Sequence, residues 1–496
     1  MAGVTDYLAI DLGASNGRVL AGAWDGNRFD VREAHRFENQ PVTVMGHVYW
    51  DALRLWEEIK TGITRHVKAN PATVAGIGVD SWGVDFALLD ADGRLLGNPY
   101  HYRDSRTDGV LEHALRLVSR QNLYAATGIQ PMKINTLFQL YSMVRAGDAQ
   151  LAAADLLLPF PNLINYWLSG TQAAEITHAT TTQCLDVGRQ QWATDLLRTL
   201  EIPVDILPRL AEPGTVLGSL LPDIGAEVGL GYGAPVIAVG CHDTASAIAA
   251  TPGLDGQSVY ISSGTWSLMG VELEAPVVNE DALEGGFTNE GGVAGTVRFL
   301  RNITGLWLVQ ECRRQWAREG ARYSWDELLA AAAQSEPFRS LVDPDDPAFL
   351  SPAEMPAAIR DACIISDQPT PETVGQVVRC CLESLAARYR ATLEDLEALV
   401  GSGFDVIHVV GGGSQNRLLC QLTADACQLP VVAGPVEAAA LGNVMVQAIA
   451  TGELGNLSQG RSAVAASVTL ERYEPAPEGA WREAVARLRS QPGAVA

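Results

Sequence analysis

Asp243 stands where a short apolar strand gives way to a helix, a place suited to acid–base chemistry. The strand is predicted over 236–239, and Gly240 ends it. Small residues at 245–249 then favour a helix that packs closely on a neighbour. Asp is a favoured helix N-cap, so a purely structural role is one interpretation. The other is a carboxylate that faces a cleft between two parts of the chain.

A second candidate is the turn between two apolar strands near the N-terminus. The strands are predicted over 7–10 and 19–23, and residues 11–18 between them read Asp-Leu-Gly-Ala-Ser-Asn-Gly-Arg. Small and hydroxyl side chains expose backbone N–H groups, as a phosphate chain requires. A plain structural hairpin is the alternative. Asp11 ends the buried strand and favours the nucleotide interpretation, because a carboxylate there can hold Mg²⁺ directly or through water.

Polar and glycine-rich turns also follow two later predicted strands. After the strand at 73–79, residues 80–85 read Asp-Ser-Trp-Gly-Val-Asp, which suits either a sugar site or a capped turn with Trp82 in the core. After the strand at 406–410, three glycines at 411–413 let another body approach the backbone closely. The three glycines fit neither the Rossmann GxGxxG pattern nor the Walker pattern.

The same order of hairpin, helix and strand occurs twice in the sequence, and these elements would position the turns. In the first, a hairpin, a helix from Asp51 and the strand at 73–79 lead to a turn. In the second, a hairpin at 258–270, a helical pattern at 374–385 and the strand at 406–410 do the same. We therefore expect two domains of related topology that share a cleft. The predicted bounds are 1–250 and 257–455, followed by a C-terminal extension at 456–496, with Thr251 to Gly256 as the linker.

One more segment, Arg298 to Glu319, is predicted to be helical from about Ile303. Asn302 and Gln310 would then lie on about the same side of that helix. These two polar residues say little about function by themselves.

Length and composition limit the classes of protein that fit. A chain of 496 residues is too long for one core, and 47% hydrophobic with 19% charged residues is typical of a globular protein. The net charge of −23 argues against nucleic acid or an anionic membrane as partner, because both select basic surfaces. Asp6 and Asp11 interrupt the N-terminal apolar run, so we expect no signal peptide. No run of eighteen apolar residues occurs, and the eight cysteines show no CxxC pair, so a cytoplasmic protein with reduced cysteines is expected.

Six groups of motifs, spread in order over nearly the whole chain, carry a resemblance to a known family. They are DLGASNGR (11–18), DSWGVDF (80–86), HDTASA (242–247), SSGTWSLMG (262–270), NEGG with RNITGLWLVQ (289–310), and VGGGSQN with AGPVEA (410–438). With these motifs the chain resembles the FGGY family of carbohydrate kinases. The resemblance implies an α/β fold of two ribonuclease H-like domains, the actin/Hsp70/hexokinase type of ATPase fold, flanking a catalytic cleft.

The resemblance also implies roles for individual residues. ATP would be contacted by Ala14, Ser15, Asn16, Gly17, Arg18, Thr265, Gln310 and Gly412. The sugar would be contacted by Gly83, His242, Asp243, Thr244 and Asn302, with Asp243 as the catalytic base. Asn16 stands where a serine is expected, and it keeps a polar side chain there.

The implied reaction is the transfer of phosphate from ATP to the 1-hydroxyl of L-rhamnulose, with Mg²⁺ near Asp11. Two alternatives stay open at this point. One is a kinase of the same family that acts on L-fuculose, a pentulose or a polyol. The other is a related ATP-driven shape switch without kinase activity. The expected partners are a small sugar and ATP, with no nucleic acid and no membrane.

Overall fold

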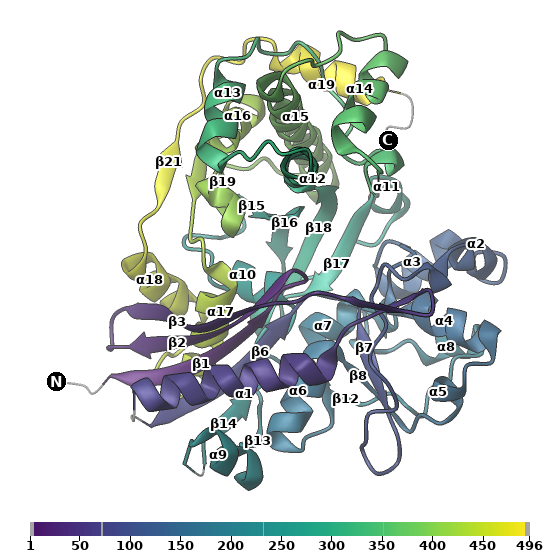
Figure 1. Cartoon of the computed structure of the whole chain (residues 1–496), viewed down its shortest axis with the longest axis vertical. Helices are drawn as coiled ribbons and strands as arrows, with labels where there is room; N and C mark the ends of the chain where they lie inside the picture. The colour runs from purple at the N-terminus through teal and green to yellow at the C-terminus, as the bar shows by residue number, and fades with distance from the viewer. Residues whose placement is uncertain (1–3, 71–72, 232, 351, 492–496) are drawn as a thin grey trace.

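Two large β-sheets organise the chain, one in each half of the molecule (Figure 1). The computed structural model describes residues 4–70, 73–231, 233–350 and 352–491. The first sheet has six strands in the order β13-β14-β6-β1-β2-β3. Their bounds are β1 Thr5–Leu12, β2 Asn16–Trp24, β3 Phe29–Glu38, β6 Val74–Ser81, β13 Val216–Ser219 and β14 Pro235–Ile237.

The second sheet repeats the plan of the first. Its seven strands run in the order β17-β18-β16-β15-β19-β20-β21. Their bounds are β15 Ser258–Ser263, β16 Trp266–Leu273, β17 Phe287–Gly291, β18 Val297–Thr304, β19 Val406–Val410, β20 Val431–Ala433 and β21 Glu471–Tyr473. In both sheets an antiparallel meander continues into two parallel strands: β3-β2-β1 with β6 and β14, and β18-β16-β15 with β19 and β20. The predicted pair of α/β domains with related topology is confirmed.

Helices cover both faces of each sheet. Those that precede the second sheet are α1 Ala52–Ala69, α2 Val110–Ala114, α3 Arg120–Thr127, α4 Thr136–Ala146, α5 Ala149–Ala152, α6 Phe160–Ser169, α7 Ile176–Thr181, α8 Thr194–Thr199, α9 Pro222–Val228 and α10 Asp243–Ala249. The later ones are α11 Glu280–Glu284, α12 Trp307–Arg318, α13 Trp325–Ala333, α14 Met355–Ile365, α15 Val374–Val400, α16 Arg417–Cys427, α17 Ala438–Ala450, α18 Leu457–Ser467 and α19 Trp481–Arg489. Short 3₁₀ turns are η1 Ser105–Thr107, η2 Val293–Gly295, η3 Pro347–Phe349 and η4 Gly412–Gln415.

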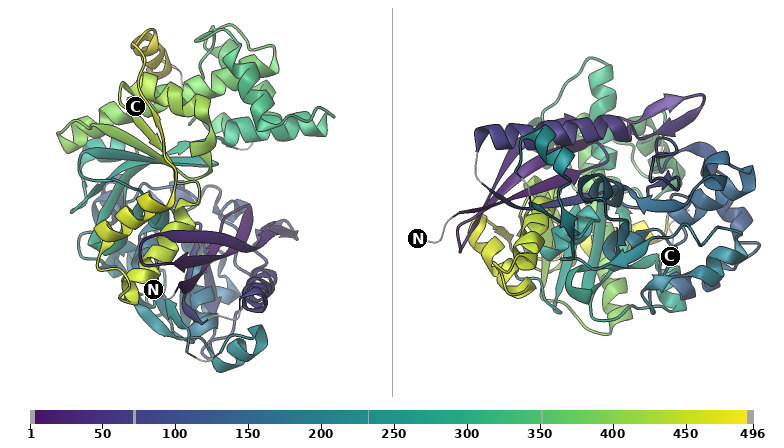
Figure 2. Two further views of the ribbon diagram at one scale, coloured as in Figure 1. Left: turned by 90° about the vertical axis from the view of Figure 1, so that its left-hand side faces the viewer. Right: turned by 90° about the horizontal axis from the view of Figure 1, so that it is seen from below.

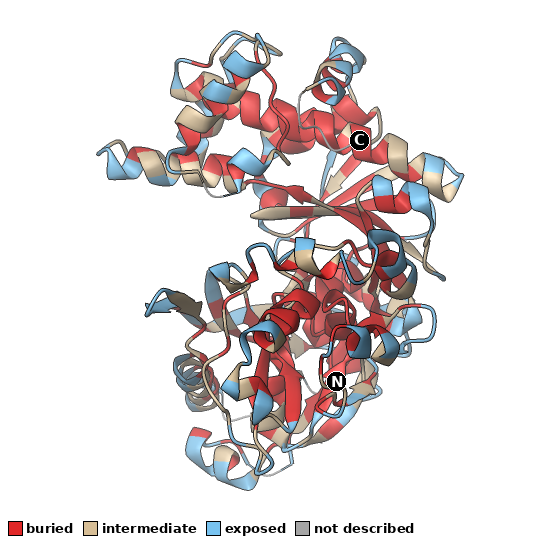
Figure 3. Cartoon of the chain, turned by 90° about the vertical axis from the view of Figure 1, so that its right-hand side faces the viewer, coloured by how far each residue is buried: buried red, intermediate tan, exposed pale blue. Residues whose placement is uncertain are grey.

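Alternation along the central strands explains how these layers form. In β1, Leu8 and Ile10 pack with the apolar side chains of α1 and α6, whereas Tyr7 and Ala9 pack with those of α17 and α18. In β15, Ile261 packs with α12 and α15. Because side chains alternate between the faces of a strand, each sheet buries both of its faces. Figure 3 shows the resulting buried layers in each half.

Helices α10 and α17 lie against each other between the two sheets. A Cβ atom at Gly442 of α17 would lie 1.8 Å from the backbone oxygen of Ser246 in α10, so only glycine permits this approach. Although α17 follows the last parallel strand of the second sheet, it packs on β1 and β6 of the first (Figure 2). The contact between these helices joins the two halves at their centre.

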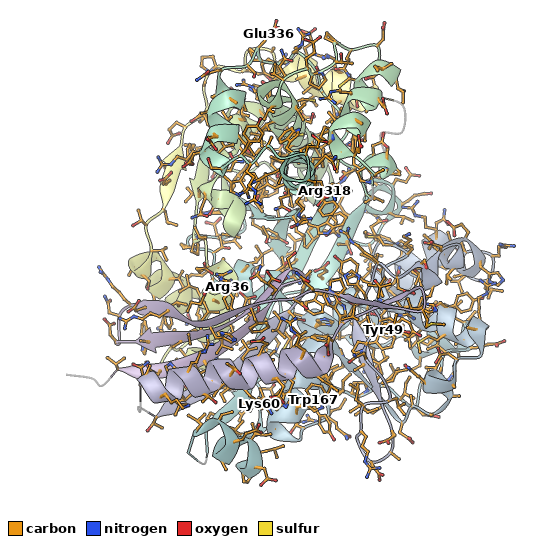
Figure 4. All side chains as sticks on the ribbon, in the orientation of Figure 1. Arg36, Tyr49, Lys60, Trp167, Arg318 and Glu336 are labelled. Atoms are coloured by element: carbon orange, nitrogen blue, oxygen red, sulfur yellow. The ribbon has the colours of Figure 1, made fainter. Side chains whose placement is uncertain are left out.

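The chain between β6 and β13 adds small elements beside the first sheet. The paired strands are β7 Phe86–Leu89 with β8 Leu156–Pro159, β9 Ala173–Glu175 with β12 Arg209–Ala211, and β10 Leu185–Asp186 with β11 Gln191–Trp192; β4 Val42–Val44 and β5 His47–Tyr49 form a further pair earlier in the chain. Figure 4 labels Lys60 of α1 and Trp167 of α6 in the first half and Glu336 at the far end of the second.

One predicted helix begins later in the structure than the sequence indicated. Residues 297–304 form strand β18 instead of the helix expected from about Ile303, and α12 begins at Trp307. Asn302 therefore lies on a strand, paired with Leu268, while Gln310 lies on the helix. The prediction that both residues share one helix is wrong.

The predicted domain bounds remain a prediction. The first sheet and α10 end before 250, and β15 begins at Ser258, so 251–256 separate two compact sets of elements. In the predicted extension, β21 joins the second sheet and α19 packs on α15. The outer limits at residues 1 and 496 lie outside the described residues.

Candidate active site

A cavity of about 450 Å³ lies between the two sheets, where their central strands end. Most of the residues that the sequence singled out line it. They are Asp11, Ala14, Ser15, Asn16, Arg18, Gly83, His242, Asp243, Thr244, Thr265, Asn302 and Gly412. The fold thus brings together turns that are up to 400 residues apart in the sequence.

Gly17 and Gln310 are the two predicted site residues that do not line this cavity. A Cβ atom at Gly17 would lie 2.3 Å from the Phe37 ring, so this glycine allows close packing of β2 on β3. Gln310 lines an adjoining cavity of about 480 Å³, together with Ser15 and Thr265, which line both. Thr265 Oγ1 donates a hydrogen bond to Gln310 Oε1 at 3.1 Å, so the two cavities meet at these side chains.

Asp243 occupies the first turn of α10, with 32% of its side-chain surface exposed at the cavity. His242 is the N-cap residue of the helix, so the interpretation of Asp243 as the N-cap is wrong. The Asp243 Oδ1 atom accepts a hydrogen bond from Thr244 Oγ1 at 3.1 Å. Burial raises the pKa of Asp243 above its ordinary value, with the charge of Asp11 acting in the same direction and His242 in the other. A carboxylate with a raised pKa is a stronger proton acceptor.

Arg18 connects the turn of residues 11–18 with the second half of the molecule. Its guanidinium pairs with Asp11 at the end of β1 and with Glu437, the N-cap of α17. Burial opposes the charge on Arg18, but these two carboxylates outweigh it and raise the pKa of the guanidinium above its usual value. Arg18 therefore stays charged at the cavity wall, beside the turn of residues 13–18.

Asp80 lies beneath these groups, fully buried at the end of β6. Its Oδ2 accepts a hydrogen bond from Asn443 Nδ2 of α17 at 2.5 Å, and Oδ1 has no hydrogen-bond partner among the described residues. Burial and the negative charge of Asp11 raise the pKa of Asp80 well above its ordinary value. Burial and Asp11 thus both oppose a second negative charge at this position.

Asp85, at the other end of the same motif, is a structural residue. It is fully buried, and its Oδ2 accepts hydrogen bonds from Trp50 Nε1 at 2.6 Å and Trp82 Nε1 at 2.9 Å. Burial raises its pKa to about 6, against the effect of these donors. Asp85 fixes Trp82, whose neighbour Gly83 faces the cavity. The interpretation as a capped turn with Trp82 in the core is confirmed for Asp85 and Trp82, and the sugar-site interpretation stays a prediction for Gly83.

Glycines and hydroxyl groups form the wall that the second sheet contributes. Ser263 and Gly264 end β15, and Gly411 to Gly413 follow β19. A Cβ atom at Gly413 would lie 2.0 Å from Ser263 Oγ, whereas one at Gly412 would meet nothing within 4 Å. The two loops therefore pack against each other, and the backbone of Gly412 remains open to a ligand.

An apolar wall faces these polar groups on another side of the cavity. Ile129, Met132 and Ile134, from the segment between α3 and α4, line it together with Tyr102. None of these residues belongs to a motif that the sequence marks as functional. They offer a surface for carbon and hydrogen atoms of a ligand.

Sequence reasoning also missed a buried charged pair, Glu290 of β17 and Arg298 of β18, which contacts His242 from the second sheet. The NEGG motif contains Glu290, but no local pattern identifies its partners, because they come from other strands.

Within the described part of the chain, no group of three or more His, Cys, Asp or Glu residues could hold a metal ion. Asp11 Oδ2 pairs with Arg18, and Oδ1 accepts no hydrogen bond from a described residue. Magnesium in phosphate-transferring sites is commonly held by one or two carboxylates together with substrate phosphates. The free oxygen of Asp11, at the cavity, fits that arrangement. Among the described helices, none has the length and apolar character needed to cross a bilayer.

Comparisons with known proteins match almost the whole chain. The profile described as the N-terminal domain of the FGGY family of carbohydrate kinases matches residues 6–249, and that of the C-terminal domain matches residues 259–451. A Bacteroides thetaiotaomicron protein named rhamnulokinase is 44% identical over 98% of this chain and 99% of its own length. An Enterococcus faecalis protein of the same name is 41% identical over 95% and 94%. Gluconate kinase from Lactobacillus acidophilus shares the fold, with a TM-score of 0.79 at 15% identity over 98% of this chain and 96% of that one.

Proposed function

The chain belongs to the FGGY family of carbohydrate kinases, and from that premise we propose that it transfers the γ-phosphoryl group of ATP to the 1-hydroxyl of L-rhamnulose. The products are L-rhamnulose 1-phosphate and ADP, a step of L-rhamnose catabolism. Two relatives that are 44% and 41% identical over nearly their full lengths bear the name rhamnulokinase, which supports this substrate.

The observation that carries the proposal is the position of Asp243. Its carboxylate opens on the cavity between the sheets, beside His242 and opposite the glycine loops of the second sheet. In the proposed reaction Asp243 takes the proton of the 1-hydroxyl while that oxygen bonds to the γ-phosphorus and the bond from phosphorus to the β,γ-bridging oxygen of ATP breaks. A carboxylate is a sufficient base here, because the proton leaves when the new P–O bond is already forming.

The phosphates of ATP would lie between the two glycine turns. The nucleotide contacts that we propose are Ala14, Ser15, Asn16, Arg18, Thr265, Gln310 and Gly412, all of which line one of the two cavities. Backbone N–H groups of such turns bind phosphate oxygens without adding charge. The adjoining cavity, which Gln310 lines, supplies room for the ribose and base.

We propose that Asp11 holds Mg²⁺, directly or through water. When bound there, Mg²⁺ neutralises phosphate charge during phosphoryl transfer. Arg18 adds a fixed positive charge on the same wall, so the acidic protein still presents cations to ATP.

The sugar would lie between Asp243 and the segment before α4. Gly83, His242, Thr244 and Asn302 supply polar contacts for its hydroxyls. L-Rhamnulose is a 6-deoxy sugar, and its methyl group needs an apolar surface rather than a hydrogen-bond donor. The wall of Ile129, Met132 and Ile134 supports such a substrate.

Closure of the two halves on both substrates would exclude water and limit futile ATP hydrolysis. All eight cysteines are buried free thiols, which supports activity in a reducing compartment, the cytoplasm. The partners proposed are the sugar and ATP alone.

A panel of ketoses tests the substrate. We expect kcat/KM for L-rhamnulose, measured by coupled ADP detection, to exceed that for L-fuculose, a pentulose and glycerol by at least roughly tenfold, the lower end of what a single group in a pocket contributes. A higher value for any of the others would identify a different sugar kinase of the family. ATP hydrolysis that no sugar accelerates, with no sugar phosphate formed, would instead indicate an ATP-driven shape switch.

A further inference from the structure

A buried charged pair of the second sheet reaches the residue next to Asp243. Glu290 of β17 and Arg298 of β18 are 6% and 0% exposed. The Nε atom of Arg298 donates a hydrogen bond to the carbonyl oxygen of Gly291 at 3.0 Å, which fixes the guanidinium. The other end of the guanidinium faces His242, the N-cap of α10.

One short distance holds the pair together, and two more join it to the imidazole. Glu290 Oε2 lies 3.0 Å from Arg298 Nη2 and 3.1 Å from His242 Nδ1. Arg298 Nη2 lies 3.2 Å from the same Nδ1 in hydrogen-bond geometry, whereas Glu290 Oε2 accepts no aligned hydrogen bond within the described chain. A guanidinium only donates, so this contact is a hydrogen bond when Nδ1 is the bare, accepting nitrogen and a neutral ring carries its proton on Nε2.

The Nε2 atom of His242 is turned toward Asp243, but the two side chains do not share a hydrogen bond. Nε2 lies 3.6 Å from Asp243 Oδ1, which is longer than an N–H···O hydrogen bond. Both residues line the cavity. The Nε2–H group is thus available to an oxygen atom of a ligand, directly beside the carboxylate.

Charged and titratable groups from the second sheet and from α7 surround His242. From the second sheet, the charges of Arg298 and Glu290 offset each other: burial acts against the Glu290 carboxylate, but the Arg298 guanidinium outweighs it and keeps the pKa of Glu290 below its ordinary value. On α7, burial lowers the pKa of His178 to about 3, and the two rings lie 6.5 Å apart. Burying a charged pair adds little to the free energy of unfolding. Stability therefore does not explain why Glu290 and Arg298 contact His242 at the cavity wall.

We propose, on the premise of the kinase activity above, that Arg298 and Glu290 are positioning residues for His242. They hold the imidazole with its proton on Nε2, where it donates a hydrogen bond to the sugar oxygen next to the hydroxyl that Asp243 deprotonates. Arg298 supplies the donor to Nδ1, and Glu290 balances its charge and fixes its position. The second sheet thereby orients a sugar-binding group of the first.

The tautomer can be measured directly in the whole protein without any substrate. In protein labelled with ¹⁵N-histidine, long-range ¹H–¹⁵N correlation spectra distinguish a protonated ring nitrogen from a bare one. Of the eight histidines, the signals lost in His242→Gln identify His242. We expect a protonated Nε2 and a bare Nδ1. In Arg298→Gln the proton should move to Nδ1, because Glu290 is then the charged acceptor beside it.

Kinetics supply a second readout. Arg298→Gln should raise KM for the sugar by roughly 10- to 100-fold, the effect of losing a strong hydrogen bond, while KM for ATP changes little. Arg301→Gln is the matched control. Arg301 is a buried arginine on the same strand, but it lies 3.9 Å from Asp345 and 3.8 Å from Asp395, away from His242. It should lose stability without a change in the tautomer or in KM for the sugar.

The wild-type spectrum decides the proposal whether or not the variants fold. A proton on Nδ1 of His242 in the wild-type protein would overturn it, and so would an unchanged tautomer in a folded Arg298→Gln protein. Glu290→Gln, which keeps the Arg298 donor, should retain the proton on Nε2. Failure of the kinase assignment would appear separately, as wild-type protein that makes no sugar phosphate.

Discussion

The two sheets have the same topology, yet their corresponding strand ends bear different chemistry. The first central strand ends in Asp11 in one sheet and in Ser263-Gly264 in the other. The next parallel strand ends in Asp80 in the first sheet and is followed by Gly411 to Gly413 in the second. The first repeat therefore presents the carboxylate of Asp11 to the shared cavity beside its own glycine turn, with Asp80 buried beneath, whereas the second repeat presents glycines and hydroxyls at these strand ends.

This difference separates two tasks that would conflict on one wall. Carboxylates accept protons and bind cations, but they repel phosphate oxygens at short range. Glycine loops bind phosphate through neutral N–H groups. In the proposed reaction the glycine loops of the second sheet contact phosphate with no carboxylate of their own, while Arg18 offsets the charge of Asp11 on the first sheet.

The paired helices α10 and α17 show the same division. Each follows the last parallel strand of its sheet, and the two pack closely at the centre. Helix α10 begins with Asp243 at the cavity, whereas α17 begins with Ala438 after Glu437, which pairs with Arg18. The carboxylate on the α17 side is thus neutralised by an ion pair, and the one on the α10 side is left open to a ligand.

Removing the carboxylate of Asp243 should cause the largest loss of activity. Asp243→Asn keeps the size of the side chain but cannot accept the proton, so kcat should fall by roughly 10²- to 10⁴-fold. Single-turnover kinetics and thermal melting would be measured together, and the melting temperature should change little. Asp51→Asn, at the N-cap of α1, is the control and should keep full activity. A kcat within a few-fold of wild type, with chemistry rate-limiting, would contradict the role of Asp243.

Placing a carboxylate on the second sheet tests the comparison from the other side. Gly412→Asp adds a charge to the loop that we propose contacts ATP, and KM for ATP should rise by roughly 10- to 100-fold because like charges then meet at short range. Gly412→Ala is the matched control, since a Cβ atom there meets nothing within 4 Å, and its KM should be near that of wild type. Equal KM values for the Asp and Ala variants would place the phosphates elsewhere.

The third effect in order of size should be a change in the Mg²⁺ concentration that turnover requires. Asp11→Asn removes the carboxylate that we propose holds Mg²⁺, and the Mg²⁺ concentration for half-maximal turnover should increase by roughly tenfold. Titration of activity with Mg²⁺ at fixed ATP measures it. An unchanged Mg²⁺ requirement would return Asp11 to a structural role as the ion-pair partner of Arg18.

Sequence reasoning succeeded where a site residue lies within its own turn. The turn at 11–18, the glycines at 411–413 and Asp243 all stand at strand ends that apolar runs define. It failed where long-range contacts decide the structure. One such contact pairs β7 with β8, about 70 residues away, whereas only a single bridge joins Leu89 to the nearby Leu95.

Strand β18 was missed for a related reason. It lies between β16 and β17, and both of its faces are buried, so Arg298 and Leu300 are as inaccessible as Phe299 and Ile303. The alternation of apolar and polar residues that marks a half-exposed strand is therefore absent. The pairing of Glu290 with Arg298 depends on the same strands and could not be predicted without them.

The smallest effect that we expect is a change in pH dependence, and it arises from the crowding of acids on the first sheet. Burial is the main cause of the raised pKa of Asp243, and the negative charge of Asp11 adds to it. Asp243 must be deprotonated to act as a base, so activity should fall as pH falls through its pKa. In Asp11→Asn a neighbouring negative charge is removed, ionisation of Asp243 becomes easier, and its pKa decreases. The acid limb of the rate should therefore move to lower pH.

That rate would be measured with both substrates below their KM, where it reports the unliganded enzyme. Glu437→Gln, which removes the other partner of Arg18, is the control, and its acid limb should stay in place. An acid limb of Asp11→Asn that coincides with the wild-type limb would show that Asp11 and Asp243 do not interact across the cavity. The carboxylates of the first sheet would then act independently, and the two sheets would differ only in the groups that they present.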